Sequence, residues 1–406
     1  MNARRSLQQY DVIIVGAGAI GSACACALRD SGLQIALLDA HEPAPFKPGA
    51  EIDLRVFALS PGTRRFLESL GAWQFMQAQR VCAYTEMSVW DATGSGTIHF
   101  DCADVGEAAL GYIVENRLLQ HVLRLRLESA GNISMIFPAA PEALAVDAER
   151  VSLSLQDGRR LQAQLLVAAD GAASATRKLA GIEAGTQAYA QQAIVAHVAT
   201  EKPHGHMARQ RFLPSGPIAL LPLEDGRCSI VWSLEDARAE HIRGLDDDAF
   251  CAAVTEASGG MLGGITSTTQ RAVFPLQRMH ARDYVQARVA LIGDAAHAVH
   301  PLAGQGVNLG YRDVAELSRV ILEAREQQRD VGDLGVLRRY QRARIGDNLA
   351  MITALDGFKR LFSNEFAPLV MLRNAGLCAV DRFTPLKHAL MRRAMGLGAD
   401  FSVLTH

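Results

Sequence analysis

The chain has 406 residues, 21% of them charged, and a formal net charge of −2 at pH 7. A nearly neutral chain without a basic, aromatic-rich stretch has no general attraction for nucleic acid, so we expect no nucleic-acid partner. Its seven cysteines are scattered without a CxxC pair, which favours a reducing cytoplasm and no metal site. The sequence predicts neither a membrane-spanning helix nor an export signal.

The first predicted element is a buried strand over 10–15, which leads into the glycine pattern GAGAIG and an Ala-rich helix. Gly16 permits a tight turn, Gly18 lets a pyrophosphate approach the backbone, and Gly21 lets the helix pack closely on the strand. This arrangement predicts a Rossmann-type nucleotide site. A Gly-rich turn without a ligand is the weaker alternative.

A second buried strand, over 33–38, ends at Asp39. A carboxylate in this position can bind both ribose hydroxyls of an adenosine. Strand, glycine turn, helix, strand and acid therefore follow one another in the order that a dinucleotide site requires.

The middle of the chain predicts several further elements. Ser60 is the expected N-cap of a helix, 86–100 is an expected hairpin, and Asn116 opens an amphipathic helix. The pattern of 151–169 predicts a second hairpin, with an unbroken return strand over 161–169.

From 187 to 268 the pattern changes to strands with few helical signals, and it turns helical again from Leu334 onward. We therefore expect an α/β fold with two interleaved domains: a Rossmann-like nucleotide-binding domain, an inserted β-rich substrate domain and a C-terminal helical extension. The expected parts are 1–186 (first part of the nucleotide domain, with strands near 84–115 joining the substrate layer), 187–280 (substrate domain), 281–333 (second part of the nucleotide domain) and 334–406 (helices over 337–354, 358–362 and 366–395).

The most informative run is 288–313, RVALIGDAAHAVHPLAGQGVNLGYRD. A short buried strand stops at Asp294, which places a carboxylate at a strand's C-terminal end, where open α/β sheets bind ligands. Gly304 and Gly306 leave the next turn without bulk, and a helix beginning near Val307 and Asn308 offers free backbone amides to an electron-rich partner.

Two histidines, His297 and His300, flank this turn. They lack a neighbouring Cys, Asp or Glu at ligand spacing, so we expect them to order the loop. Metal ligation is the weaker alternative.

Three motifs together resemble a known family. GAGAIG at Gly16, AADG at Asp170 and LIGDAAHAVHPLAGQGVNLGYRD around Asp294 are similar to the three fingerprints of the single-component FAD-dependent aromatic hydroxylases, which share the 4-hydroxybenzoate hydroxylase-like fold. HPLAGQGVNLG also resembles the signature of the branch that acts in ubiquinone biosynthesis. Further branch-like strings are DLR at 53–55, IVEN at 113–116, SIVWSL at 229–234 and AMGL at 394–397.

The resemblance implies FAD as cofactor and NAD(P)H as a transient co-substrate. Arg55 would contact FAD between pyrophosphate and ring, Asn116 would reach the ribityl region, and Asp294 would bind ribityl hydroxyls. Asp170 and Gly171, with Arg177, would handle FAD and NAD(P)H, although a plain strand-end turn remains an alternative for Asp170. The implied FAD-binding residues are Gly16, Gly18, Gly21, Asp39, Arg55, Asn116, Asp170, Gly171, Asp294, Pro301, Gly304, Gln305, Gly306, Val307 and Asn308.

The implied reaction is NAD(P)H-driven insertion of one oxygen atom from O2 into the ring of a polyprenylated phenol, and no residue is assigned as catalytic. SIVWSL and AMGL place the chain nearest the C5-hydroxylating branch, the 2-polyprenylphenol 6-hydroxylase type. A 3-demethoxyubiquinol hydroxylase, an FAD hydroxylase of a small soluble aromatic acid and a non-enzymatic FAD-binding assembly protein are the alternatives.

The segment 359–395 carries seven Lys or Arg residues against two acids, interleaved with leucines. Because a polyprenyl tail is poorly soluble, we expect this segment to contact a membrane surface or a ubiquinone-biosynthesis assembly, through Arg373, Lys387, Arg392 and Arg393. A helix packed on the core with solvated basic residues is an equal alternative. The expected location is the cytoplasm, with a peripheral position on the inner face of the plasma membrane as the alternative.

Overall fold

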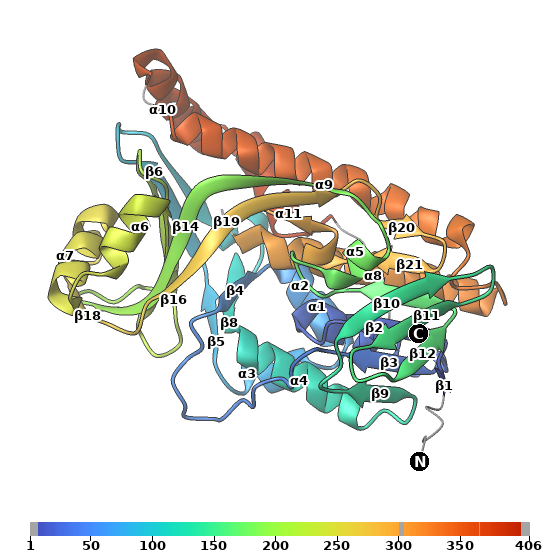
Figure 1. The fold of residues 1–406 in the computed structure, drawn as a ribbon. Coiled ribbons are helices and arrows are strands. Elements are labelled where there is room, and N and C mark those ends of the chain that lie inside the picture. Colours follow the sequence, from blue (N-terminus) through green and yellow to red (C-terminus); the bar gives the residue numbers. More distant parts are fainter. Residues whose placement is uncertain (1–6, 300–303, 365, 399–406) are drawn as a thin grey trace.

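The computed structural model describes residues 7–299, 304–364 and 366–398. Two large sheets organise it, one at each end of the molecule (Figure 1). The mixed α/β fold expected from the sequence is confirmed. The domain boundaries remain predictions, because the strands of both sheets are drawn from several separate parts of the chain.

The first sheet has six strands in the order β20-β21-β13-β2-β3-β9. The five strands from β21 to β9 are parallel, so their carboxyl ends lie at one edge of the sheet. The strands are β2 (Val12–Val15), β3 (Ile35–Leu38), β9 (Ile133–Ile136), β13 (Leu165–Ala168), β20 (Val285–Gln286) and β21 (Val289–Leu291). Helices α1 (Ala19–Ala27), α4 (Asn116–Glu128) and α8 (Gln305–Glu326) pack together beside it, and a smaller sheet of β1 (Leu7–Gln9), β10 (Pro141–Val146), β11 (Val151–Leu155) and β12 (Arg160–Ala163) shares its core.

The prediction of one unbroken return strand over 161–169 is wrong, because the strand is interrupted at Gln164. Residues before this point form β12 in the small sheet, and residues after it form β13 in the six-stranded sheet. The amides of Gln164 and Leu165 both donate to the carbonyl of Asp11 at 3.1 Å. One shared acceptor therefore turns the chain from one sheet into the other.

The second sheet has nine strands in the order β22-β19-β14-β17-β16-β15-β6-β7, with β18 also pairing β14. They are β6 (Glu86–Asp91), β7 (Thr97–Asp101), β14 (Ala184–Thr200), β15 (Met207–Phe212), β16 (Ile218–Pro222), β17 (Cys228–Glu235), β18 (Ile265–Thr268), β19 (Ala272–Ala281) and β22 (His297–Ala298). Helices α6 (Asp236–Arg243) and α7 (Asp247–Ser258), which the sequence reading missed, cover one face. A three-stranded sheet of β4 (Val56–Leu59), β5 (Val81–Tyr84) and β8 (Gly111–Glu115) lies between the two large sheets.

Several local predictions are confirmed. The Ser60 hydroxyl accepts from the amide of Thr63 and caps α2 (Pro61–Ser69), and α4 begins at Asn116. The short helices α3 (Trp73–Gln77) and α5 (Ala175–Leu179) complete this part. Helix α8 begins at Gln305, two residues before the predicted start, because Gly304 takes a left-handed conformation at its N-cap.

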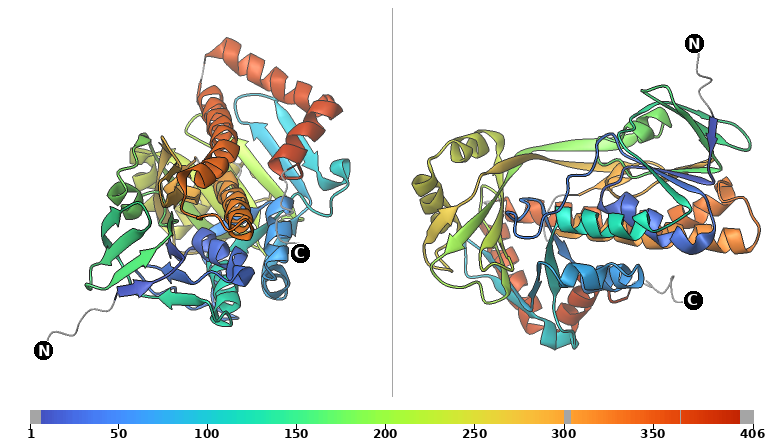
Figure 2. Two further views of the ribbon diagram at one scale, coloured as in Figure 1. Left: turned by 90° about the vertical axis from the view of Figure 1, so that its right-hand side faces the viewer. Right: turned by 90° about the horizontal axis from the view of Figure 1, so that it is seen from below.

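The described part of the C-terminal region is helical and is drawn in orange and red in Figure 2. The first, α9 (Leu334–Phe362), is continuous where the sequence reading placed two helices, and the last predicted helix is divided into α10 (Ala367–Arg382) and α11 (Thr384–Ala394). Within the described ranges no helix combines the length and apolarity needed to cross a bilayer.

Two of the basic side chains expected to face solvent are instead paired with acids of the protein. Arg373 is 4% exposed, and its Nε donates to Asp91 Oδ2 on β6 at 2.5 Å. Lys387 on α11 pairs with Asp104 and Asp381. The proposal that Arg373 and Lys387 form a free cationic surface is therefore wrong, because both cations hold these helices to the protein.

Candidate functional site

A cavity of about 550 Å³ opens at the carboxyl edge of the six-stranded sheet. It gathers predicted site residues from the whole chain. Those lining it are Gly16, Gly18, Asp39, Arg55, Asn116, Asp170, Gly171, Asp294 and Val307. Pro301 and His300 lie outside the described residues.

The three glycines of the first turn have different roles. Gly16 has a φ of +106°, and a Cβ there would lie 2.4 Å from the carbonyl oxygen of Ala169. A Cβ on Gly21 would lie 1.8 Å from the carbonyl oxygen of Gly16. These two glycines are required by the protein's own packing. Gly18 also lines the cavity, but there the nearest atom to a Cβ would be Gln120 Nε2 at 3.9 Å. Gly18 therefore provides the open approach that a pyrophosphate needs at a helix start.

Asp39 is fixed by two backbone amides. Its Oδ2 accepts from Ala17 at 2.8 Å and its Oδ1 from His41 at 3.0 Å. These bonds join the end of β3 to the glycine turn. The carboxylate remains on the cavity wall, where the predicted ribose contact would occur.

Asp170 lines the cavity, and it also forms the strand-end turn that was the alternative role for this residue. Its Oδ1 accepts from the Ser174 hydroxyl, and its Oδ2 accepts from the amide of Thr176 at 2.9 Å. Arg177 is buried and donates to the carbonyls of Ala172 and Ala295. The turn is thereby tied to the Asp294 turn on the neighbouring strand, and any role in FAD or NAD(P)H handling stays a prediction.

The Asp294 turn is a single 3-10 turn, Gly293–Ala295, directly after β21. Burial raises the pKa of the Asp294 carboxyl, and the charges of His297 and Arg55 oppose that rise. Behind the turn, Asp313 Oδ2 accepts from the amide of Gly293 at 3.1 Å. Asp313 on α8 therefore holds the backbone next to Asp294, the residue predicted to bind the ribityl chain.

The turn into α8 is held by Asn308, whose side chain is buried. Its Nδ2 donates to the carbonyls of Ala58 and Gly304, and its Oδ1 accepts from the Ser60 amide at 2.9 Å. A Cβ on Gly304, which has a φ of +61°, would lie 2.9 Å from Ala58 Cβ. Sequence reasoning assigned only backbone amides here, and the side chain of Asn308 proves to be the group that orders the turn.

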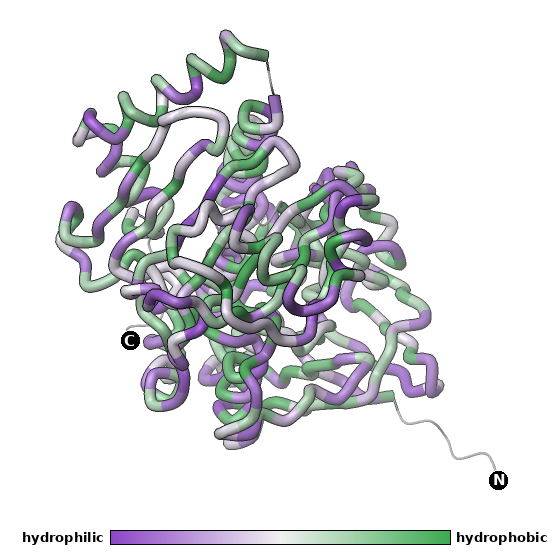
Figure 3. The backbone as a smooth tube through the Cα atoms, turned by 90° about the vertical axis from the view of Figure 1, so that its left-hand side faces the viewer, coloured by the Kyte–Doolittle hydropathy of each residue, from purple (hydrophilic) through white to green (hydrophobic). Residues whose placement is uncertain are grey.

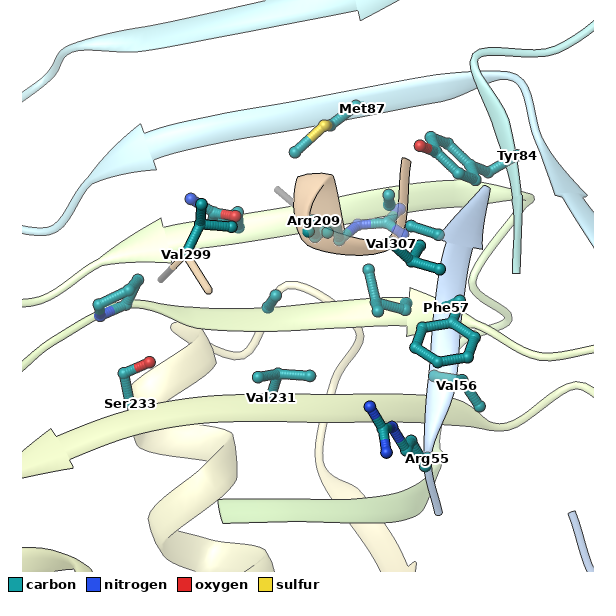
Figure 4. A pocket seen from close by; sticks show the side chains of 18 of the residues that line it. Arg55, Val56, Phe57, Tyr84, Met87, Arg209, Val231, Ser233, Val299 and Val307 are labelled. Atoms are coloured by element: carbon teal, nitrogen blue, oxygen red, sulfur yellow. The ribbon is translucent and has the colours of Figure 1, made fainter. Parts of the chain in front are cut away.

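A second cavity, of about 270 Å³, lies between this turn and the nine-stranded sheet (Figure 4). Arg55, Phe57, Asp294 and Val307 line both cavities. Its wall is mostly apolar, and burial raises the pKa of the one tyrosine, Tyr84, to about 12. The sequence reading missed its lining residues, which include Val56, Phe57, Tyr84, Met87, Arg209, Val231, Ser233 and Val299.

His297 orders the loop, as expected. Its Nε2 lies 2.5 Å from Asp313 Oδ2 in a fully buried pair. Within the part of the chain that the structure describes, no group of three or more His, Cys, Asp or Glu side chains could hold a metal ion.

Comparison with known proteins finds relatives along most of the chain. The family model for the FAD binding domain matches residues 9–346. The chain is 38% identical over 390 residues to the 3-demethoxyubiquinol 3-hydroxylase of Escherichia coli, covering 96% of this chain and 99% of the relative. It is 36% identical to the mitochondrial ubiquinone biosynthesis monooxygenase of Homo sapiens, covering 94% of this chain and 92% of the relative.

Solved structures share the fold. The p-nitrophenol 4-monooxygenase of Pseudomonas putida superimposes with a TM-score of 0.79 at 17% identity, covering 97% of this chain and all of the other. HpxO of Klebsiella pneumoniae, solved with FAD and uric acid, gives 0.71 at 20% identity, covering 95% and 97%.

The fold and the paired cavities define a single-component flavoprotein monooxygenase that binds FAD. Within this class the chain belongs to the FAD-dependent hydroxylase family of ubiquinone biosynthesis. The open backbone at Gly18 and the convergence of nine of the predicted residues on one cavity fit the cofactor.

Proposed function

We propose that the protein hydroxylates the aromatic ring of a polyprenylated phenol intermediate of ubiquinone biosynthesis, using NAD(P)H and O2. The observation that carries the proposal is the wall shared by the two cavities, formed by Arg55, Phe57, Asp294 and Val307. A ring in the smaller cavity would lie beside a cofactor in the larger one. When bound, FAD supplies the electron transfer from NAD(P)H and the activation of O2.

The protein's own residues position the ring and limit water. Val56, Met87 and Val231 give the smaller cavity an apolar wall, which suits an aromatic ring. An apolar wall that limits water also favours oxygen insertion into the ring over release of hydrogen peroxide.

For the ring position we propose C5 hydroxylation, which the strings at 229–234 and 394–397 favour. The similarity to the 3-demethoxyubiquinol 3-hydroxylase supports a second candidate. Complementation of strains lacking one defined ubiquinone-pathway hydroxylase, with analysis of the accumulated quinone intermediates, separates the two. Growth restored in neither strain, together with NADPH oxidation that no prenylphenol stimulates, would contradict the proposed function.

We further propose that α10 rests on an anionic lipid surface, where it would meet the prenylated substrate. Its polar side chains face inward: Asn374 donates to Asp91 and to Val370, and Asp381 accepts from the amide of His99 on β7. Its apolar residues Met371 and Leu372 are 73% and 65% exposed. The tube of α10, at the top of Figure 3, alternates between apolar and polar residues. A helix that carries exposed apolar residues and the exposed cation Arg382 suits a lipid surface.

The contact can be tested by sedimentation with vesicles of phosphatidylglycerol and phosphatidylcholine. The double variant Met371→Ser with Leu372→Ser should bind several-fold less protein, because about 0.8 kcal/mol is lost for each buried methylene removed. Leu349→Ser, on the exposed side of α9, is the matched control. Equal vesicle binding by the wild type and the double variant would contradict the proposal, as would association of the wild type with partner proteins but not with vesicles.

A further inference from the structure

The smaller cavity contains one cation that the proposed function has not used. Arg209 extends from β15 onto a wall formed otherwise by side chains such as Met87, Leu221 and Val231 (Figure 4). A charged group on an apolar wall is expensive to place unless it meets a partner. The chemical nature of that partner therefore indicates which kind of aromatic ligand the cavity binds.

The backbone fixes only part of the guanidinium. Nη1 donates to the carbonyl of His204 at 2.8 Å and to that of Met207 at 3.0 Å. Carbonyl oxygens carry no net charge, so these bonds orient Arg209 without neutralising it. Backbone fixation at one amino group also lowers the conformational entropy lost when a ligand binds the others.

No acid neutralises the charge either. Across residues 7–299, 304–364 and 366–398, no carboxylate forms an ion pair with Arg209 within 4.0 Å. The acid that acts on it from further away, Glu86, pairs instead with His99 at 3.1 Å. Burial lowers the pKa of Arg209, but an arginine remains protonated at neutral pH. The cavity therefore has a fixed positive charge on its wall.

The other ionisable groups of this wall do not provide the missing anion. Tyr84 stays a neutral phenol because burial raises its pKa to about 12. Burial raises the pKa of the Asp294 carboxyl, which belongs to the wall shared with the cofactor cavity. An anion for Arg209 must come from the ligand.

We propose that Arg209 binds the ionised hydroxyl of the aromatic substrate, so that the cavity selects a phenolate over a neutral ring. This inference rests on the proposed function, in which the substrate is a phenol. The hydroxyl proton passes to solvent water, and the O⁻ that remains accepts from the guanidinium as a charge-assisted hydrogen bond. A phenolate oxygen donates electron density into its ring, which makes the ring carbons more reactive toward an electrophilic oxygen.

The test uses the FAD-loaded enzyme without NAD(P)H and the chromogenic probe 4-nitrophenol, whose ionised form absorbs visible light. In the wild type, the pKa of the bound probe should fall by about one to two units, a ten- to hundred-fold preference for the phenolate. Arg209→Gln should abolish the fall. Arg209→Lys should retain part of it, because an ammonium keeps the charge but loses the planar fork.

Matched ligands separate an electrostatic role from a structural one. The methyl ether 4-nitroanisole cannot ionise and should bind the wild type and Arg209→Gln equally. Equal loss of both probes in the variant would show that Arg209 only shapes the wall and would overturn the inference. An Arg209 dependence confined to 4-nitrobenzoate would also overturn it, since the residue would then serve a ring carboxylate.

Two further readouts separate this inference from the proposed function. Flavin absorbance retained after gel filtration reports FAD binding, and product analysis with a prenylphenol reports hydroxylation. A wild type that binds no FAD or forms no hydroxylated product contradicts the proposed function. Hydroxylation by the wild type, combined with an unshifted probe pKa, overturns only the assignment of Arg209.

Discussion

Asp313 on α8 and His297 on β22 form a buried pair, with His297 Nε2 2.5 Å from Asp313 Oδ2. The other carboxylate oxygen accepts from Arg344 Nε at 3.0 Å and from Asn348 on α9. Burial alone would raise the pKa of Asp313, but His297 and Arg344 lower it to about 2. One carboxylate therefore joins the Gly293 turn, the edge of the nine-stranded sheet and two long helices.

Asp313→Asn should destabilise the protein by about 3–5 kcal/mol near neutral pH, because it leaves buried donors and the Arg344 charge without their acceptor. A carboxyl whose pKa is lower in the folded state stabilises above its unfolded pKa of about 4, and this contribution is lost as pH falls toward about 2. Urea unfolding of both proteins should therefore show the difference shrinking over that window. Asp347→Asn, at a carboxylate 32% exposed, is the milder control. A difference that does not change with pH would contradict the role of the charge.

The glycine turn should separate folding from cofactor binding. Gly18→Val should give a folded protein with greatly weakened FAD affinity, because its side chain would enter an open cavity. Gly16→Val and Gly21→Val should instead reduce the yield of folded protein, because their Cβ atoms would collide with backbone. Circular dichroism and flavin binding measured on each variant distinguish the two effects. Full flavin binding by Gly18→Val would remove the pyrophosphate assignment.

Asp294→Ala should weaken FAD binding about ten- to a hundred-fold, because a hydrogen bond to a charged acceptor contributes about 1.5–3 kcal/mol. Asp294→Asn should lose less, since an amide oxygen still accepts. Fluorescence titration of the apoprotein with FAD measures both. Affinities unchanged in both variants would show that the ribityl chain is held elsewhere.

The Asp91–Arg373 pair should account for the attachment of α10. Arg373→Met removes the guanidinium that bonds Asp91 and Thr93, and should cost about 3–5 kcal/mol because it leaves a buried carboxylate. Lys387→Met should cost about 0–1 kcal/mol, since the two acids that it meets are about a third exposed. Thermal or urea unfolding that ranks the two variants equally would contradict this assignment.

The sequence predicted those parts of the fold that local patterns determine. Strand, glycine turn and acid are close in the chain, so the placement of Gly18 and Asp39 on one cavity followed from spacing and strand order. The cap at Ser60 followed from local chemistry in the same way. The direction of a charged side chain on a helix is different, because it depends on an acid far away in sequence. Arg373 faces inward only because Asp91 lies opposite it.

The smaller cavity could not be predicted for a related reason. Its wall combines β4, β15, β16 and β17 with the turn before α8, and alternating apolar strands give no signal of which face meets which neighbour. An arginine in a strand, such as Arg209 with Arg211 two residues further along β15, resembles any solvent-exposed residue until the sheet is assembled. The break at Gln164 was missed because both halves have strand character and only their partners differ.

The interleaving of the two sheets also determines when the protein can fold. Strand β13 needs β21, which ends at Leu291, as its neighbour on one side, and the nine-stranded sheet reaches from β6 to β22. Most of the chain must therefore leave the ribosome before either sheet is complete, and pairings over such long sequence separations form slowly. A chain that stops before β21 exposes β13 as an unpaired apolar edge, which promotes aggregation. Nonsense mutations ahead of residue 291 should consequently leave insoluble protein, rather than a smaller flavin-binding fragment.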